Sequence, residues 1–280
     1  MPTFDTPEPI SVTAHVGAGS LRFTASDRLD TAVEVRPGNP KRDKDVQAAE
    51  QTEVSYASGV LTVRTKERRF IGPSGLVDVT VDLPTGSRVD ITGSWTQVFG
   101  EGRLGEVRGK TSGGDVRLDT TGPLQLTASH SSIIVDRIEG NAEITSSSGS
   151  LRVGTVDGTA VLKNSHGTTT VGAATGELRV SGAHGDVDIA RAEDSVTATT
   201  AHGALRVGEV ARGTVQLDTS YGLIEIGIRE GTAAWLDVSS ERGQVHNALA
   251  DSAPPATAED TVKVRARTRW GNIDVRRARP

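Results

Sequence analysis

The chain has 280 residues, a formal net charge of −5 and no cysteine, and its 32 glycines far outnumber its four Phe, three Trp and two Tyr. This composition excludes a disulfide framework, a thiol nucleophile and a cysteine-ligated zinc site, and it argues against a strongly basic nucleic-acid-binding protein. No run of about 18 apolar residues is present and the first residues resemble no secretory signal, so we expect a cytoplasmic protein without a membrane-spanning segment.

The first third of the chain predicts short, irregularly spaced strands. Residues 10–92 contain several stretches in which apolar and polar side chains alternate, separated by charged loops at 37–51 and 66–75. Alternation over four or five residues indicates a strand with one buried face, because successive side chains point to opposite sides. We therefore assign residues 1–95 to an irregular β cap at the N-terminal end of the fold.

An internal repeat occupies residues 96–250. The motif Gly-x-apolar-x-apolar recurs every 18 residues, with copies that begin at Gly149, Gly167, Gly185 and Gly203. A second series, nine residues out of phase, begins at Gly122, Gly140, Gly158 and Gly176. Each 18-residue unit therefore holds two short strands. The glycine before each strand indicates a sharp turn, often with positive φ.

A fixed period of short strands is typical of a β-solenoid, in which each coil buries its apolar face only against its neighbours. The sequence predicts an all-β fold, a right-handed parallel β-solenoid with 18-residue coils of two short strands each. Equivalent positions of successive coils should then lie side by side, about 4.8 Å apart. One such inward column is Leu151, Thr169, Val187 and Leu205. An antiparallel β-sandwich is the alternative, but it gives no reason for a constant register.

The C-terminal segment, residues 251–280, begins with a Pro/Ala-rich stretch and ends with two strands and a basic tail. Arg265, Arg267 and Arg269 alternate along the first of these strands and therefore project from one of its faces. They indicate either charge placed on an exposed sheet edge to prevent end-to-end association, or a binding site for an anionic partner. Trp270 is the only aromatic residue beside them, so no nucleic-acid partner is expected.

Four of the six histidines occupy one position of the repeat, directly before the main glycine or its equivalent: His130, His166, His184 and His202. If the register holds, the last three stack on consecutive coils. Imidazoles that close together could hold a metal ion or respond to pH, although tetrahedral zinc needs convergent rather than collinear ligands. The structural alternative is a ladder of stacked planar side chains at a turn.

Several segments of the chain resemble a known family. The segments 147–158, Ala183-His-Gly-Asp-Val-Asp-Ile189 and 201–210, after the opening Phe4-Asp-Thr-Pro-Glu-Pro-Ile-Ser-Val12, resemble a bacterial β-strand-repeat family. Its members are designated "putative adhesin" or domain of unknown function, and the resemblance covers nearly the whole chain. It implies an adhesion or interaction role and supplies no catalytic motif.

Together these features predict a non-catalytic scaffold or adhesion module that presents repetitive polar faces to a protein or glycan partner, with no cofactor. One alternative is a metal- or pH-responsive binding module built on the histidine column. Another is a carbohydrate-active β-helix enzyme, which would need two carboxylates within about 5–10 Å of each other in a groove. Ser165 and His166 form no nucleophilic pair, because adjacent side chains on a strand diverge.

Overall fold

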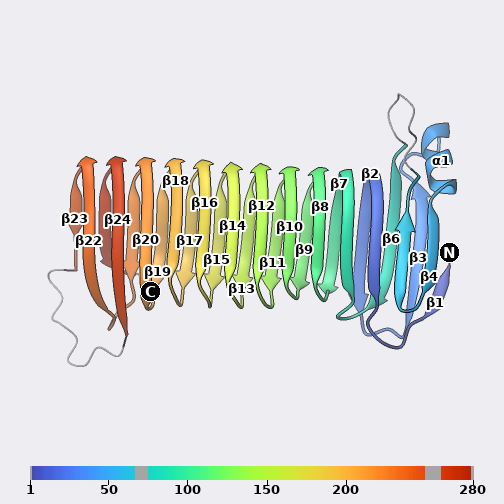
Figure 1. The fold of residues 1–280 in the computed structure, drawn as a ribbon, viewed down its shortest axis with the longest axis horizontal. Helices are drawn as coiled ribbons and strands as arrows, with labels where there is room; N and C mark the ends of the chain where they lie inside the picture. The colour runs from blue at the N-terminus through green and yellow to red at the C-terminus, as the bar shows by residue number, and fades with distance from the viewer. Residues whose placement is uncertain (1, 67–74, 250–259, 279–280) are drawn as a thin grey trace. The chain divides into compact units, whose positions relative to one another are not determined.

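The computed structural model describes residues 2–66, 75–249 and 260–278, in which every regular element except one helix is a β-strand (Figure 1). The strands belong to two units, residues 1–139 and 140–280, and most of them pair in parallel. The predicted all-β, mainly parallel solenoid is therefore confirmed, and the antiparallel sandwich is excluded. Within the described residues no helix is long and apolar enough to cross a membrane.

The N-terminal unit contains parallel coils closer to its beginning than the sequence indicated. Its elements are β1 (Thr3–Asp5), β2 (Ser11–Ser26), β3 (Asp30–Pro37), α1 (Asp43–Glu50), β4 (Glu53–Ala57), β5 (Val60–Arg64), β6 (Val77–Pro84), β7 (Arg88–Arg103), β8 (Val107–Gly113), β9 (Val116–Thr121), β10 (Leu124–His130) and β11 (Ile133–Ile138). Strand β2 pairs in parallel with β5 along its first half, with β6 along its second half, and with β7 on its other edge. Residues 1–95 thus hold true coils in addition to capping strands.

Antiparallel strands cover the coil formed by β5 and β6. Strand β4 runs antiparallel to β5, and β3 runs antiparallel to β6 and to β1. The inward side chains beneath them, such as Leu61 and Val81, are fully buried. Reversing the strand direction ends the parallel stack, which protects an edge that could otherwise pair with another chain.

Helix α1 lies inside the segment 37–51, which the sequence predicted to be a loop, so that prediction is wrong. The segment has no apolar periodicity that would indicate a helix. Instead, the buried carboxylate of Asp45 accepts a hydrogen bond of 3.0 Å from the backbone N–H of Leu76. A long-range contact of this kind cannot be read from local sequence.

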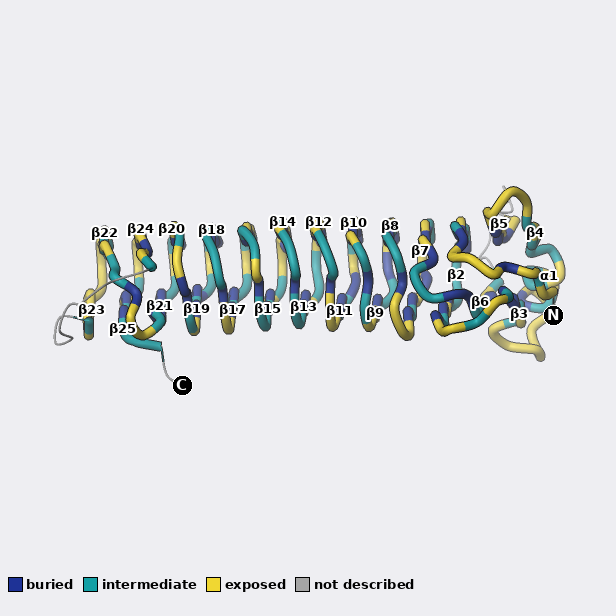
Figure 2. The backbone as a smooth tube through the Cα atoms, turned by 90° about the horizontal axis from the view of Figure 1, so that it is seen from below, coloured by how far each residue is buried: buried dark blue, intermediate teal, exposed yellow. Residues whose placement is uncertain are grey.

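The C-terminal unit is built of two parallel stacks. Its strands are β12 (Ala142–Ser148), β13 (Leu151–Val156), β14 (Ala160–His166), β15 (Thr169–Ala174), β16 (Leu178–His184), β17 (Val187–Ala192), β18 (Val196–His202), β19 (Leu205–Val210), β20 (Gly213–Tyr221), β21 (Ile224–Ile228), β22 (Ala233–Arg242), β23 (Val245–Asn247), β24 (Thr261–Trp270) and β25 (Ile273–Arg277). Even-numbered strands pair with even-numbered ones, and odd with odd. The predicted column Leu151, Thr169, Val187 and Leu205 is in register, and each residue is at most 3% exposed. Buried and more exposed residues follow one another along the coils of this unit (Figure 2).

A column of polar side chains lies at the turns of this unit. It consists of the buried Asn164, Thr200, Thr219 and Thr268 and the half-buried Ser240, each two residues before the planar side chain or arginine that ends its strand. The Asn164 amide donates to the carbonyl oxygen of Gly149 at 3.0 Å, and the Thr219 hydroxyl donates to that of Gly203 at 3.1 Å. These bonds satisfy turn carbonyls that face the inside of the coil.

The last coil in sequence is not the last coil in space. After β21 the chain forms β22 and β23, and it then returns to place β24 between β20 and β22 and β25 between β21 and β23. The arginine-bearing strand therefore has a neighbour on both sides, and the prediction that it lies on a sheet edge is wrong. Alternation identifies the buried face of a strand but not which strands are its neighbours.

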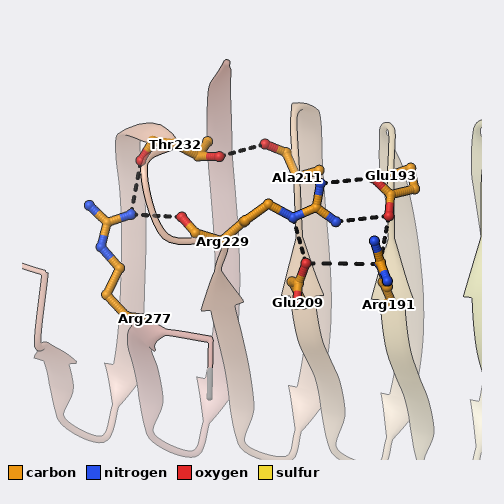
Figure 3. A network of polar contacts seen from close by, with 7 residues as sticks. All are labelled: Arg191, Glu193, Glu209, Ala211, Arg229, Thr232 and Arg277. Atoms are coloured by element: carbon orange, nitrogen blue, oxygen red, sulfur yellow. Dashed lines mark hydrogen bonds and ion pairs between the residues drawn. The ribbon is translucent and has the colours of Figure 1, made fainter. Parts of the chain in front are cut away.

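An ion-pair network joins three successive corners of the C-terminal unit (Figure 3). The Arg229 guanidinium donates to both carboxylate oxygens of Glu193, at 2.8 and 2.9 Å, and to Glu209 at 2.5 Å. Arg191 donates to the same Glu193 carboxylate at 2.6 Å. The hydrogen bond from Arg229 is the main reason that the pKa of Glu193 lies below its ordinary value.

Replacing Arg229 with glutamine should lower the free energy of unfolding at pH 7 by about 1 kcal/mol. Because the pKa of Glu193 is lowered in the folded state, its contribution is complete at neutral pH and is lost as pH falls through the folded value. The difference between wild type and Arg229→Gln should therefore shrink below about pH 4. Urea unfolding of both proteins at pH 7 and pH 3 measures this difference in the free energy of unfolding.

Arg179→Gln is the matched control, since Arg179 bonds Glu177 as an exposed pair at 2.8 Å. It should change stability by less than about 0.5 kcal/mol at either pH. Equal losses in the two variants, or a loss for Arg229→Gln that is undiminished at pH 3, would contradict the role given to the network.

Candidate functional site

Planar side chains stack along one corner of the C-terminal unit. The ring centroids of His166 and His184 are 5.2 Å apart, those of His184 and His202 4.8 Å, and those of His202 and Tyr221 4.9 Å, with interplanar angles of 21°, 18° and 4°. The parallel register supplies one ring per coil at about this spacing, which suits face-to-face packing of flat groups. The predicted stacking of the three histidines is confirmed.

The inserted strand β24 extends this column beyond the histidines. Trp270 stacks on Tyr221 at 6.2 Å, and the guanidinium carbon of Arg242 lies 4.3 Å from the centre of the Trp270 ring. We call His166, His184, His202, Tyr221, Trp270 and Arg242 the planar ladder. All six side chains are exposed, so the ladder presents ring edges to solvent.

The stacking of the ladder sets how the nitrogens of the predicted metal site are arranged. Stacked rings turn their faces toward one another, so the nitrogens of His166, His184 and His202 follow the column instead of converging on a point. In the described part of the chain no group of three or more His, Cys, Asp or Glu side chains is arranged to hold a metal ion. Metal binding by the three histidines stays a prediction. His130 belongs to the other unit, where it lies in register with Gly113.

A row of four basic side chains lies on the outward face of β24. Lys263, Arg265, Arg267 and Arg269 occupy successive outward positions, and we call them the basic row. Its members include the three arginines predicted as a partner-binding site. Arg265 lies in register between Gln216 of β20 and Asp237 of β22. Polar and acidic side chains thus flank the row on both sides.

Ion pairs fix part of the basic row. Arg267 donates to the Asp237 carboxylate at 2.6 Å and to the Asp237 carbonyl oxygen at 2.7 Å. The hydrogen bond between the Arg267 guanidinium and the Asp237 carboxylate is the main reason that the pKa of Asp237 lies below its ordinary value. The Arg269 Nε atom, in contrast, is 3.9 Å from Glu241, too far for a hydrogen bond. Arg267 is therefore held by hydrogen bonds, whereas Arg269 makes only the longer ion pair with Glu241.

An open groove of about 310 Å³ runs across β18, β20, β24 and β22 beside the ladder. All ten of its lining residues are polar, and the charged ones are Asp218, Glu241, Arg267 and Arg269. Thr219 and Thr268 are two of its buried lining residues, and their hydroxyls donate to turn carbonyls at 3.1 and 3.0 Å. The groove therefore combines buried threonines with half-buried and exposed charged and hydroxyl groups.

Every tryptophan of the protein is on its surface. Trp95, Trp235 and Trp270 are 67%, 74% and 43% exposed, whereas tryptophan is on average among the more buried residues. Trp235 lies in register with Lys263 at one end of the basic row, and Trp270 follows Arg269 at the other. The sequence identified the arginines but missed Trp235, Lys263 and the groove. The signal available was that Trp235 occupies an outward position in an alternating strand.

A model of the family described as Toastrack DUF4097 matches residues 10–276. No curated protein matches the chain. Similar solved structures include a "putative adhesin" from Parabacteroides merdae, 14% identical with a TM-score of 0.45, in which the match covers 81% of this chain and 94% of that one.

Two further solved structures come from Parabacteroides distasonis. One is a "putative adhesin", 16% identical with a TM-score of 0.43, matched over 81% of this chain and 95% of that one. The other is a "putative lipid binding protein", 12% identical with a TM-score of 0.42, matched over 99% and 96%. Because the family model extends through both units and covers most of the sequence, the chain belongs to the Toastrack DUF4097 family.

Proposed function

We propose that the protein is a non-catalytic interaction module that binds a protein or glycan partner on the outward face of its C-terminal coils. The observation that carries this proposal is the exposure of Trp235 and Trp270 at the two ends of the basic row, beside an all-polar groove. Exposure of the apolar face of an indole to water is unfavourable, and tryptophan is enriched where a partner covers the surface. Charged and hydroxyl groups between them supply hydrogen bonds that orient the partner.

The electrostatics of this face suit binding better than catalysis. Hydrolysis of a glycan needs one carboxyl group that keeps its proton near neutral pH, which requires a raised pKa. The ion pair with Arg267 instead lowers the pKa of Asp237. Asp218 accepts a hydrogen bond of 2.9 Å from Gln216, the arrangement of a structural contact.

Tryptophan fluorescence tests the proposal, because all three indoles report on the surface. The full chain is titrated with dextran, polygalacturonate, mucin and gelatin, and acrylamide quenching is measured at each step. We expect at least one polymer to protect the indoles without being cleaved. Binding of that polymer, measured by isothermal titration calorimetry because the readout must not depend on the indoles removed, should be lost in Trp235→Ala/Trp270→Ala and kept in Trp95→Ala, the matched control in the other unit. Cleavage of a bound polymer that Asp218→Asn or Glu241→Gln abolishes would overturn the proposal.

A further inference from the structure

The geometry points to an acidic polysaccharide, a chain of uronate or sulfated sugars, as the ligand of the groove and the basic row. This inference rests on the proposed function and names the chemistry of its partner. Three features of the C-terminal unit carry it: the spacing of the cations, the exposed indole of Trp235 and the polarity of the groove.

The cations match a chain of separated acidic groups. Alternate residues on one strand lie about 7 Å apart, so the basic row from Lys263 to Arg269 extends over about 20 Å. Guanidinium groups bind carboxylate and sulfate through paired hydrogen bonds, with more directional preference than an ammonium group. Arg269 is available for such a bond because its distance to Glu241 is 3.9 Å. Arg267, held by Asp237, keeps the centre of the row in place.

Trp235 supplies a stacking surface at one end of the row. Its indole is 74% exposed and lies beside Lys263, whereas the faces of Trp270 are covered by Tyr221 and Arg242. An indole has a broad apolar face, against which the C–H face of a sugar ring can pack while the sugar hydroxyls stay in water. A platform of this kind next to a cation fits a charged sugar.

The lining of the groove favours a saccharide over a folded protein. Protein interfaces have an apolar core, but none of the ten lining residues is apolar. Hydroxyls such as those of Thr199, Ser220 and Ser239 can exchange hydrogen bonds with sugar hydroxyls, and the carboxylates of Asp218 and Glu241 can accept from them. The residues that line the groove are therefore all polar, and the exposed indoles, Trp235 and Trp270, lie at the two ends of the basic row.

Acidic side chains beside the row disfavour a nucleic acid. Asp218, Asp237 and Glu241 lie among the cations on both flanking strands. A nucleic acid carries a charge at every nucleotide and relies on a surface that is positive along its whole length. The carboxylates would repel such a strand, whereas a polysaccharide with fewer charges can place its neutral hydroxyls beside them.

The test measures binding of defined polymers to the full chain by isothermal titration calorimetry. The probes are polygalacturonate, chondroitin sulfate, neutral dextran and an oligothymidylate. We expect both acidic polysaccharides to bind, dextran and oligothymidylate to bind at least tenfold more weakly, and affinity to fall as salt is raised. Arg265→Gln/Arg269→Gln should weaken polygalacturonate binding by about tenfold or more.

Arg152→Gln/Arg179→Gln is the matched control, because it removes the same charge from outward positions of other coils in the same unit. It should change affinity less than twofold, and unchanged circular dichroism should show that all variants fold. Equal weakening by the two double variants, or stronger binding of oligothymidylate, would overturn the inference. Equal binding of dextran, or no binding of either acidic polysaccharide while gelatin protects the indoles in the quenching experiment above, would also overturn it but leave the proposed function intact; polymer cleavage would overturn both.

Discussion

Replacing Val196 with aspartate should unfold the C-terminal unit, whereas the same substitution at the next residue, Thr197, should leave it folded. Val196 is fully buried and lies in register between Leu178 and Val215 inside the coil. An unpaired carboxylate there costs several kcal/mol, comparable to the whole stability of a domain. Because each coil is stabilised only by its neighbours, the damage should spread to the coils on both sides.

Thr197 is the control because it faces outward on the same strand, in register with Arg179 and Gln216. Thr197→Asp places its charge in water near a cation, so stability should change by no more than about 0.5 kcal/mol. Far-UV circular dichroism and urea unfolding at pH 7 measure both variants. A cooperative transition for Val196→Asp at the wild-type urea midpoint would show that residue 196 does not face the core.

The coils could be predicted from the sequence because each of them needs a glycine at its turn and apolar side chains on its inward face. Gly203 has φ of +153°, and a Cβ atom there would lie 2.1 Å from the carbonyl oxygen of Gly185 in the preceding coil. Only glycine satisfies both the dihedral angle and the close approach. The glycine period therefore records where coils turn and touch, and alternation between turns records the inward face.

The order of the coils could not be predicted in the same way. The inward residues of β24, such as Val262 and Val264, alternate as regularly as those of any inner coil. The inward residues of β22, such as Leu236 and Val238, alternate with polar residues just as regularly. They are only half-buried, because β22 is the last strand of its stack. An inner and an outer parallel strand share one pattern, so neighbours must be known from three-dimensional structure.

The candidate site depends on this insertion. The sequence identified the histidine column and the three arginines as separate features, because more than 60 residues lie between them in the printed chain. Placing β24 against β20 stacks Trp270 on Tyr221 and continues the ladder. Placing β22 beyond it brings Trp235 beside Lys263 and Asp237 beside Arg265. Only the register between strands joins these groups into one surface.

Engineered disulfides test the position of β24 directly, since the chain has no cysteine of its own. Arg265 is in register with Gln216 on one side and with Asp237 on the other, and all three positions face outward. Neighbouring strands lie about 4.8 Å apart, within the range that a disulfide spans. Strands separated by one intervening strand are about 10 Å apart, beyond that range.

We expect Gln216→Cys/Arg265→Cys and Asp237→Cys/Arg265→Cys to form disulfides on mild oxidation, and Gln216→Cys/Asp237→Cys to keep both thiols. Intact-mass analysis after thiol alkylation distinguishes the two results. A disulfide between positions 216 and 237, with no link from either to 265, would place β22 directly against β20. That result would contradict the insertion of β24 and the binding surface that depends on it.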